Sequence, residues 1–257
     1  MNRIEELFST KNRNILSVYF TAGFPVLNSV EKIILLLENK GADMIEIGIP
    51  FSDPLADGPA IQESGRVALE NGISVKNIFL QIRDIRKKTQ IPLLLMSYLN
   101  PPLQYGFENF CRDAAINGID GLIIPDLPEK EFMQEYKQYM DKYGLLNIFL
   151  ITPDTSPERI RKIDKMSRGF IYMVSSASTT GKTNDISYGQ AEYFKSIAGM
   201  NLMNPVLAGF GIYDGKTREK AASFVNGVIV GSAYIRALNQ GLTIENSTNE
   251  FFCKIGG

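Results

Sequence analysis

The chain has 257 residues, of which 44% are apolar and 21% charged, and its formal net charge is −1. This is the composition of a globular protein, with enough length for one large α/β domain or two small ones. The near-neutral charge argues against nucleic acid or an anionic membrane as the main partner, because both usually select a basic excess. The chain contains no histidine, so acid–base chemistry would depend on carboxylates, tyrosines or lysines.

The two cysteines, Cys111 and Cys253, lie far apart without the spacing of a metal site, which indicates reduced thiols. No apolar run approaches the roughly 18 residues that span a bilayer. The first residues have mixed charge and lack the apolar core of a signal peptide. We therefore expect a cytoplasmic protein with no metal and no membrane partner.

Short apolar runs alternate with amphipathic stretches along the chain. In chain order the pattern predicts strand 15–23, helix 29–40, strand 44–50, a helix–turn–helix at 65–88, strand 91–98, helix 107–117, strand 121–125, helix 128–143, strand 145–152, helix 156–167, strand 170–175, helix 188–199, strand 205–209, helix 216–224, strand 228–230 and a C-terminal helical stretch. The helix at 29–40, for example, has one apolar stripe and is followed by Gly41 as a stop signal.

The repeated order of strand and helix indicates a parallel sheet. Eight such units in 257 residues fit an α/β fold, a single (β/α)8 TIM barrel with an extra N-terminal helix, as one domain over residues 1–257. An open doubly wound sheet is the alternative, but it would place a glycine-rich turn after the first strand. Here the glycine-rich turns come late. A barrel would carry its chemistry in the loops that follow the strands.

Glu46 interrupts the apolar strand at 44–50, where an unpaired carboxylate is costly. Because side chains alternate along a strand, Met44, Glu46 and Gly48 share one face and three isoleucines share the other. The isoleucine face would pack under the helices, so Glu46 would point into the barrel. A structural ion pair is the alternative to an acid–base role for this residue.

The loop after this strand adds Asp53 and Asp57 among prolines and a glycine, at the expected mouth of the barrel. A buried acid followed by an acidic loop is typical of a proton-transfer site. Each aspartate taken alone could equally cap its loop. We keep that interpretation for Asp53, which sits in a Ser-Asp-Pro turn.

The stretch EIGIPFSDPLADGPAIQ at residues 46–62 resembles the signature of the tryptophan synthase alpha subunit family. The resemblance continues at 95–101 (LMSYLNP), 124–128 (IPDLP), 171–175 (IYMVS) and 209–212 (GFGI), and it covers essentially the whole chain. It implies a (β/α)8 barrel that cleaves indole-3-glycerol phosphate to indole and glyceraldehyde 3-phosphate in the last steps of tryptophan biosynthesis, a carbon–carbon lyase without a cofactor of its own.

By this resemblance Glu46 is the expected acid–base catalyst, and Asp57 is the carboxylate that binds the indole N–H. One carboxyl group that first gives and then takes a proton can serve the cleavage, and a second near the ring nitrogen can stabilise the positive charge that develops there. We expect burial to raise the pKa of Glu46. Tyr172 corresponds to a tyrosine near the acid, although core packing explains it equally well. The residues that correspond to the indole pocket, again with core packing as the alternative, are Tyr19, Met96, Tyr98 and Phe210.

Glycines follow the last three predicted strands, and the loops after strands seven and eight are a recurring phosphate site in such barrels. Backbone N–H groups there can point at an anion. By the resemblance, the phosphate contacts would be Gly181, Gly211, Gly231 and Ser232. The polar stretch 176–185 is the expected lid over the substrate and includes Thr180. Its flank, Ala177-Ser178-Thr179, departs from the family pattern.

Other functions fit the sequence less well. An aldolase that forms a Schiff base needs a lysine on a strand, and none of the predicted strands contains one. A metal-dependent aldolase would need histidines or clustered carboxylates. A catalytically silent regulatory subunit is a further alternative, against which the presence of Glu46 and Asp57 argues.

The resemblance also implies a partner. The family pairs with a beta subunit that uses pyridoxal phosphate, forms an α2β2 tetramer and passes indole to that subunit. By this resemblance Asp53 and Pro54 would form part of the contact. Some relatives work alone and release indole, which is the alternative for this chain.

Overall fold

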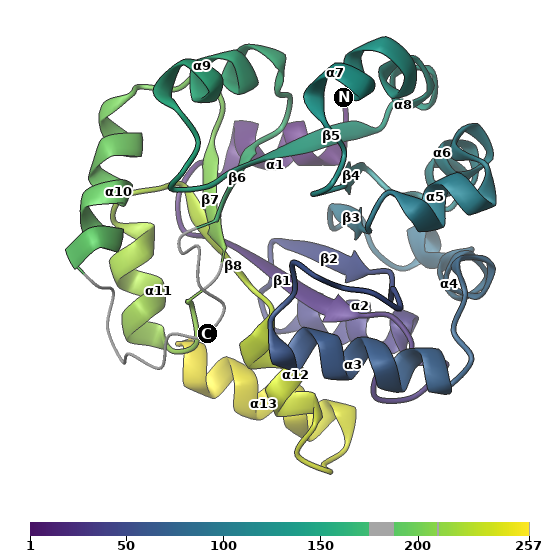
Figure 1. Cartoon of the computed structure of the whole chain (residues 1–257). Coiled ribbons are helices and arrows are strands. Elements are labelled where there is room, and N and C mark those ends of the chain that lie inside the picture. Colours follow the sequence, from purple (N-terminus) through teal and green to yellow (C-terminus); the bar gives the residue numbers. More distant parts are fainter. Residues whose placement is uncertain (175–187, 210, 257) are drawn as a thin grey trace.

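The computed structural model describes residues 1–174, 188–209 and 211–256. It contains a closed barrel of eight parallel strands in sequence order, in which β8 pairs with β1 (Figure 1). The strands are β1 (Ile15–Thr21), β2 (Met44–Gly48), β3 (Leu93–Met96), β4 (Gly121–Ile123), β5 (Leu146–Ile151), β6 (Ile171–Val174), β7 (Val206–Gly209) and β8 (Gly227–Val230). The predicted barrel is confirmed, although most strands are shorter than predicted, because ladder pairing ends before the apolar runs do.

Helices lie around the outside of the barrel and, in the case of α1, across one of its ends (Figure 1). They are α1 (Arg3–Thr10), α2 (Val30–Asn39), α3 (Pro59–Glu70), α4 (Val75–Ile82), η1 (Ile85–Lys87), α5 (Asn100–Tyr105), α6 (Phe107–Ile116), α7 (Glu129–Glu131), η2 (Phe132–Tyr136), α8 (Lys137–Tyr143), α9 (Pro157–Met166), α10 (Tyr188–Gly199), α11 (Gly215–Ala222), α12 (Ser232–Leu238) and α13 (Ile244–Ile255). Within the described ranges, none of these helices has the length and apolar character needed to cross a membrane.

Three helical predictions need correction. The helix predicted from residue 65 begins earlier, at Pro59, because proline is well tolerated in the first turn, where its missing N–H costs no helical hydrogen bond. The sequence pattern does not predict helix α5, because its two prolines resemble a turn signal, yet both lie in its first turn. The helix predicted at 128–143 contains the π-helical segment η2, a register change that side-chain periodicity does not reveal.

The barrel wall separates two apolar clusters. On β2, Ile45 and Ile47 belong to the outer cluster between strands and helices, whereas Met44 belongs to the inner cluster that fills the barrel. Glu46 lies on the same face as Met44 because side chains alternate along the strand. The prediction that Glu46 points into the barrel is therefore confirmed.

Helix α1 closes the end of the barrel at which the strands begin. Ile4 is fully buried among the inner side chains. Asn2 caps the helix, with Glu5 completing the capping box, and its side chain also donates to the Asp120 carbonyl oxygen at 2.8 Å. The expected N-terminal helix is thus present, and it is attached to the barrel by hydrogen bonds as well as by packing.

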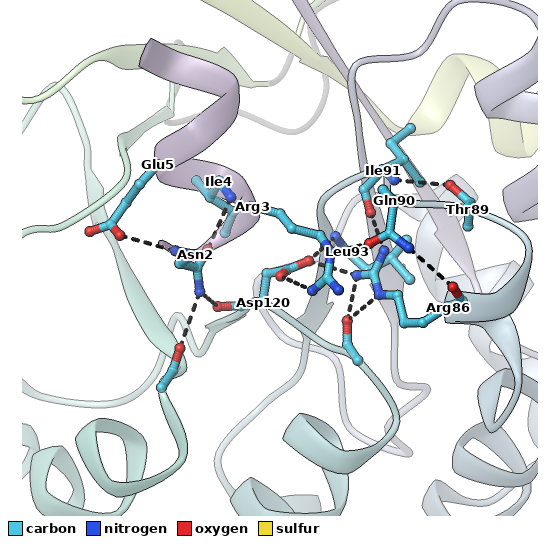
Figure 2. A network of polar contacts seen from close by, with 12 residues as sticks. Asn2, Arg3, Ile4, Glu5, Arg86, Thr89, Gln90, Ile91, Leu93 and Asp120 are labelled. Atoms are coloured by element: carbon cyan, nitrogen blue, oxygen red, sulfur yellow. Dashed lines mark hydrogen bonds and ion pairs between the residues drawn. The ribbon is translucent and has the colours of Figure 1, made fainter. Parts of the chain in front are cut away.

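A buried carboxylate anchors this closed end (Figure 2). Asp120, which directly precedes β4, is only 3% exposed. It accepts hydrogen bonds from Arg3 Nη1 at 3.0 Å, Arg86 Nη2 at 2.7 Å and the Leu93 backbone N–H at 2.9 Å. Arg86 also donates to the Gly118 carbonyl oxygen. Because the carboxylate is paired on both oxygens, its burial is compensated, and it joins α1 to the starts of β3 and β4.

Candidate active site

The opposite end of the barrel, at which the strands end, holds the predicted acid. Glu46 lies on β2 beside Tyr19 of β1 and Leu94 of β3, and it has no solvent exposure. Its Oε1 accepts a hydrogen bond from Ser17 Oγ at 2.8 Å. Among the described residues, no donor reaches Oε2.

The electrostatics of Glu46 follow from this environment. Burial raises its pKa to about 8, and the hydrogen bond from Ser17 opposes part of that rise. At neutral pH the carboxyl is therefore mainly protonated. A carboxyl group in this state can donate a proton, and after donation it becomes a base.

Two tyrosines lie close to the acid because two glycines leave room for them. A Cβ atom on Gly48 would lie 2.1 Å from the Tyr19 hydroxyl oxygen, and one on Gly209 would lie 2.3 Å from the Tyr172 hydroxyl oxygen. Burial, and then the neighbouring charges of Glu46 and Asp57, raise the pKa of both tyrosines. The structure therefore brings both phenols into the field of both carboxylates.

Asp57 lies in the loop between β2 and α3 and is half-buried. Its Oδ2 accepts a hydrogen bond from the Tyr98 hydroxyl at 3.3 Å, and that hydroxyl accepts from the Ala56 backbone N–H at 2.9 Å. Burial raises the pKa of Asp57 to about 6, with Tyr98 opposing the rise. The carboxylate is thus mainly ionised at neutral pH, in contrast to Glu46, so the two acids are suited to different tasks.

The other predicted pocket residues lie around this pair. Met96 of β3 is the register neighbour of Gly48, and it packs against the inner cluster. The Tyr98 ring packs against Phe51, with ring centroids 5.1 Å apart. Phe210 lies outside the described residues. Tyr19, Met96 and Tyr98 are therefore at the end of the barrel where Glu46 lies.

The predicted phosphate residues are described only in part. Gly231 directly follows β8 and precedes α12, which begins at Ser232. A Cβ on Gly231 would lie 3.2 Å from the Tyr19 ring, so this turn adjoins the acid site. Gly211 has a φ of 76°, a conformation that favours glycine. Thr180, Gly181 and the flank Ala177-Ser178-Thr179 lie outside the described residues.

The predicted partner residues lie on the outer side of the loop after β2. Asp53 is exposed and accepts a hydrogen bond from Ser52 Oγ at 2.5 Å. Pro54 is half-buried. Leu55, next in the chain, is 94% exposed. The loop therefore presents Asp57 inwards and an apolar tip outwards.

Ser17 is a site residue that the sequence pattern does not identify. It lies inside the barrel, two residues before Tyr19, and it is fully buried. A serine at an inward position of an apolar strand is the signal that could have identified it, because a buried hydroxyl needs a partner. No group of acidic or cysteine side chains in the described part of the chain is arranged to hold a metal ion.

The chain matches the family model "Tryptophan synthase alpha chain" over residues 6–255. It is 54% identical to the tryptophan synthase alpha chain of Phocaeicola vulgatus over 240 residues, which cover 93% of each chain. Among solved structures, it is similar to the tryptophan synthase alpha chain of Legionella pneumophila, with a TM-score of 0.87, 30% identity and coverage of 99% of this chain and 96% of that one.

A second similar structure belongs to a tryptophan synthase from M. tuberculosis in an aminoacrylate-bound form. The TM-score is 0.83 at 31% identity, over 98% of both chains. The family model and the curated relative both extend across nearly the whole barrel, including the strand that carries Glu46 and the loop that carries Asp57. The chain therefore belongs to the tryptophan synthase alpha chain family.

Proposed function

We propose that Glu46 is the acid–base catalyst in the cleavage of indole-3-glycerol phosphate to indole and glyceraldehyde 3-phosphate, the reaction of this lyase family. One observation carries the proposal. A fully buried carboxyl group with a pKa near 8 has a single hydrogen-bond donor on one oxygen, while its second oxygen meets no donor among the described residues. Such a group can give a proton at neutral pH and then take one back.

The steps balance with this one carboxyl group. Protonated Glu46 gives its proton to the ring carbon that bears the side chain, which makes the indole a leaving group. The resulting carboxylate takes the proton from the hydroxyl on the adjacent side-chain carbon. As that oxygen becomes a carbonyl, the carbon–carbon bond breaks and its electron pair restores the indole ring. Glu46 ends in the protonated state in which it began.

Asp57 has the complementary role in this proposal. Ring protonation places positive charge on the indole nitrogen, and a nearby carboxylate that accepts its N–H stabilises that charge. The mainly ionised state of Asp57 at neutral pH supports this assignment. The hydrogen bond from Tyr98 supports it further, because it orients the carboxylate.

The other assignments follow from their place around the two acids. Tyr172 would contact the reacting end of the substrate near Glu46, and Tyr19, Met96 and Tyr98 would line the indole pocket. The turn at Gly231 and Ser232, together with Gly211, would bind the phosphate through backbone N–H groups. Their support is that Gly231 adjoins Tyr19, so the phosphate turn and the pocket are contiguous.

Asp57→Asn is expected to lower kcat/KM for indole release by about 10²-fold, because the amide keeps the shape but loses the charge opposite the indole N–H. Initial rates of indole formation by the purified chain measure this. Asp84→Asn is the matched control, since it removes an exposed carboxylate that pairs with Lys87 away from the strand ends. An Asp57→Asn rate within twofold of the wild-type rate would contradict the assignment.

We further propose that the chain works with a tryptophan synthase beta subunit, in an α2β2 tetramer in which the partner carries pyridoxal phosphate and this chain carries no cofactor. The exposed tip of the loop after β2 supports a contact there. Asp53 supplies a charge and Pro54 a rigid turn, and the 94% exposed Leu55 supplies apolar area. The same loop carries Asp57, so a partner that orders the tip would also act on the site.

Mixing the chain with a tryptophan synthase beta subunit is expected to give a species with the mass of two copies of each chain and to raise the rate of indole release about tenfold. Light scattering after gel filtration and initial rates measure the two effects. Asp53→Asn should weaken the activation, whereas Asp84→Asn should leave it intact. An unchanged mass and rate on mixing would identify a lyase that works alone.

A further inference from the structure

Ser17 is the one polar side chain that holds the Glu46 carboxyl in the described part of the barrel. Its Oγ donates to Glu46 Oε1 at 2.8 Å, and no other hydrogen bond to the Glu46 carboxyl is present among the described residues. Both residues have no solvent exposure. Water therefore does not compete for this bond, which is stronger in such an environment than at a surface.

The surroundings of Ser17 give its hydroxyl no other described partner. On the inner face of the barrel it lies beside Met44 of β2 and Ile229 of β8, both of which belong to the inner apolar cluster. Two buried polar groups in apolar surroundings are expected to pair with each other, because each would otherwise remain unsatisfied. The pairing fixes which oxygen of Glu46 is occupied.

We propose that Ser17 is a positioning residue that holds Oε1 of Glu46 and so reserves Oε2 for proton transfer with the substrate. This inference rests on the proposed role of Glu46. Ser17 is buried behind the acid, so it acts through Glu46 and does not bind the substrate. The asymmetry between the two oxygens is what a carboxyl group that alternately gives and takes one proton requires.

The charged and titratable groups around Glu46 determine how this role can be detected. Among the described residues they are Tyr19 on β1 and Tyr172 on β6, with Asp57 in the loop after β2, whose charge acts on the same two phenols as that of Glu46, while the β3 neighbour, Leu94, is apolar. Neither tyrosine ionises near neutral pH, since burial raises the pKa of each. Asp57 titrates near pH 6, below the pKa of Glu46, which is near 8. An activity change above pH 7 thus reports on Glu46.

Ser17→Ala is expected to lower kcat about 10- to 100-fold, the range for loss of a hydrogen bond to a charged group, with KM within twofold of wild type. Because Ser17 favours the ionised form of Glu46, its loss raises the pKa of the acid. The fall in rate that is expected of the wild-type chain as pH rises through about 8, the alkaline limb of its pH profile, should therefore move to higher pH. Indole-release kinetics between pH 6 and 10 measure kcat, KM and the pH at which the rate falls on the alkaline limb.

Ser17→Cys and Ser247→Ala complete the test. Cysteine keeps a weak donor of similar size, so it should recover part of kcat and return the limb towards its wild-type position. Ser247 is a fully buried serine on α13, whose hydroxyl has no described partner. Its replacement by alanine should change neither kcat nor the position of the alkaline limb. A purely structural role would lower stability while leaving the limb in place, and this outcome would overturn the proposal. If Glu46→Gln stays active, the failure lies instead with the proposed function.

Discussion

Glu46→Gln is expected to reduce kcat for indole release from indole-3-glycerol phosphate by about 10³-fold or more. General acid–base groups contribute roughly 10²- to 10⁴-fold, and here one carboxyl group serves two proton transfers. Glutamine keeps the shape and the acceptor that Ser17 contacts, but it can neither give nor take the proton. Steady-state assays of the purified variant at pH 7 measure the effect, and circular dichroism shows whether the fold is retained.

Glu245→Gln is the matched control for this change. It removes one carboxylate from α13, where Glu245 pairs with Lys32 and both side chains are about half exposed, so activity should stay within twofold of wild type. If the Glu46→Gln variant is folded and retains more than about a tenth of the wild-type kcat, Glu46 is not the proton carrier. The same site would then have to use a tyrosine, although burial raises the pKa of both nearby phenols.

Asp120→Asn is expected to lower the free energy of unfolding by about 3 kcal/mol or more. The carboxylate is 3% exposed and pairs with Arg3 and Arg86, so its neutralisation leaves two guanidinium groups without their counter-charge in partly buried positions. One carboxylate oxygen of Asp120 accepts a hydrogen bond from the Leu93 backbone N–H. In the variant, the amide group has only one oxygen to serve the partners that two oxygens serve in the wild type. Urea denaturation followed by circular dichroism measures the change.

The Lys32–Glu245 pair again supplies the comparison. Its loss through Glu245→Gln should cost less than about 1 kcal/mol, because exposed ion pairs contribute little. Catalysis provides a second readout, since Asp120 lies at the end of the barrel opposite Glu46. Folded Asp120→Asn protein should keep the wild-type KM. Equal stability losses in the two variants would show that the network in Figure 2 does not anchor α1.

The helical boundaries show where local pattern fails. Proline at the start of α3 and α5 resembles a break in the sequence, although it occupies first-turn positions in both helices. The π-helical segment η2 leaves the apolar periodicity nearly unchanged. At these prolines the local sequence fits a turn as well as a helix, and in η2 it fits an α-helix as well as a π-helix. Packing against the barrel selects between the two conformations.

The sequence by itself determined the barrel, the inward direction of Glu46 and the family. Strand and helix periods follow from backbone geometry, and the alternation on β2 follows from the strand alone. Only the tertiary structure decided which residues meet the acid. Ser17 and Tyr19 come from β1, Asp57 from the loop after β2 and Tyr172 from β6, and their approach depends on barrel closure and on the space left by Gly48 and Gly209. The raised pKa of Glu46 has the same origin, because burial belongs to the assembled barrel and not to the strand.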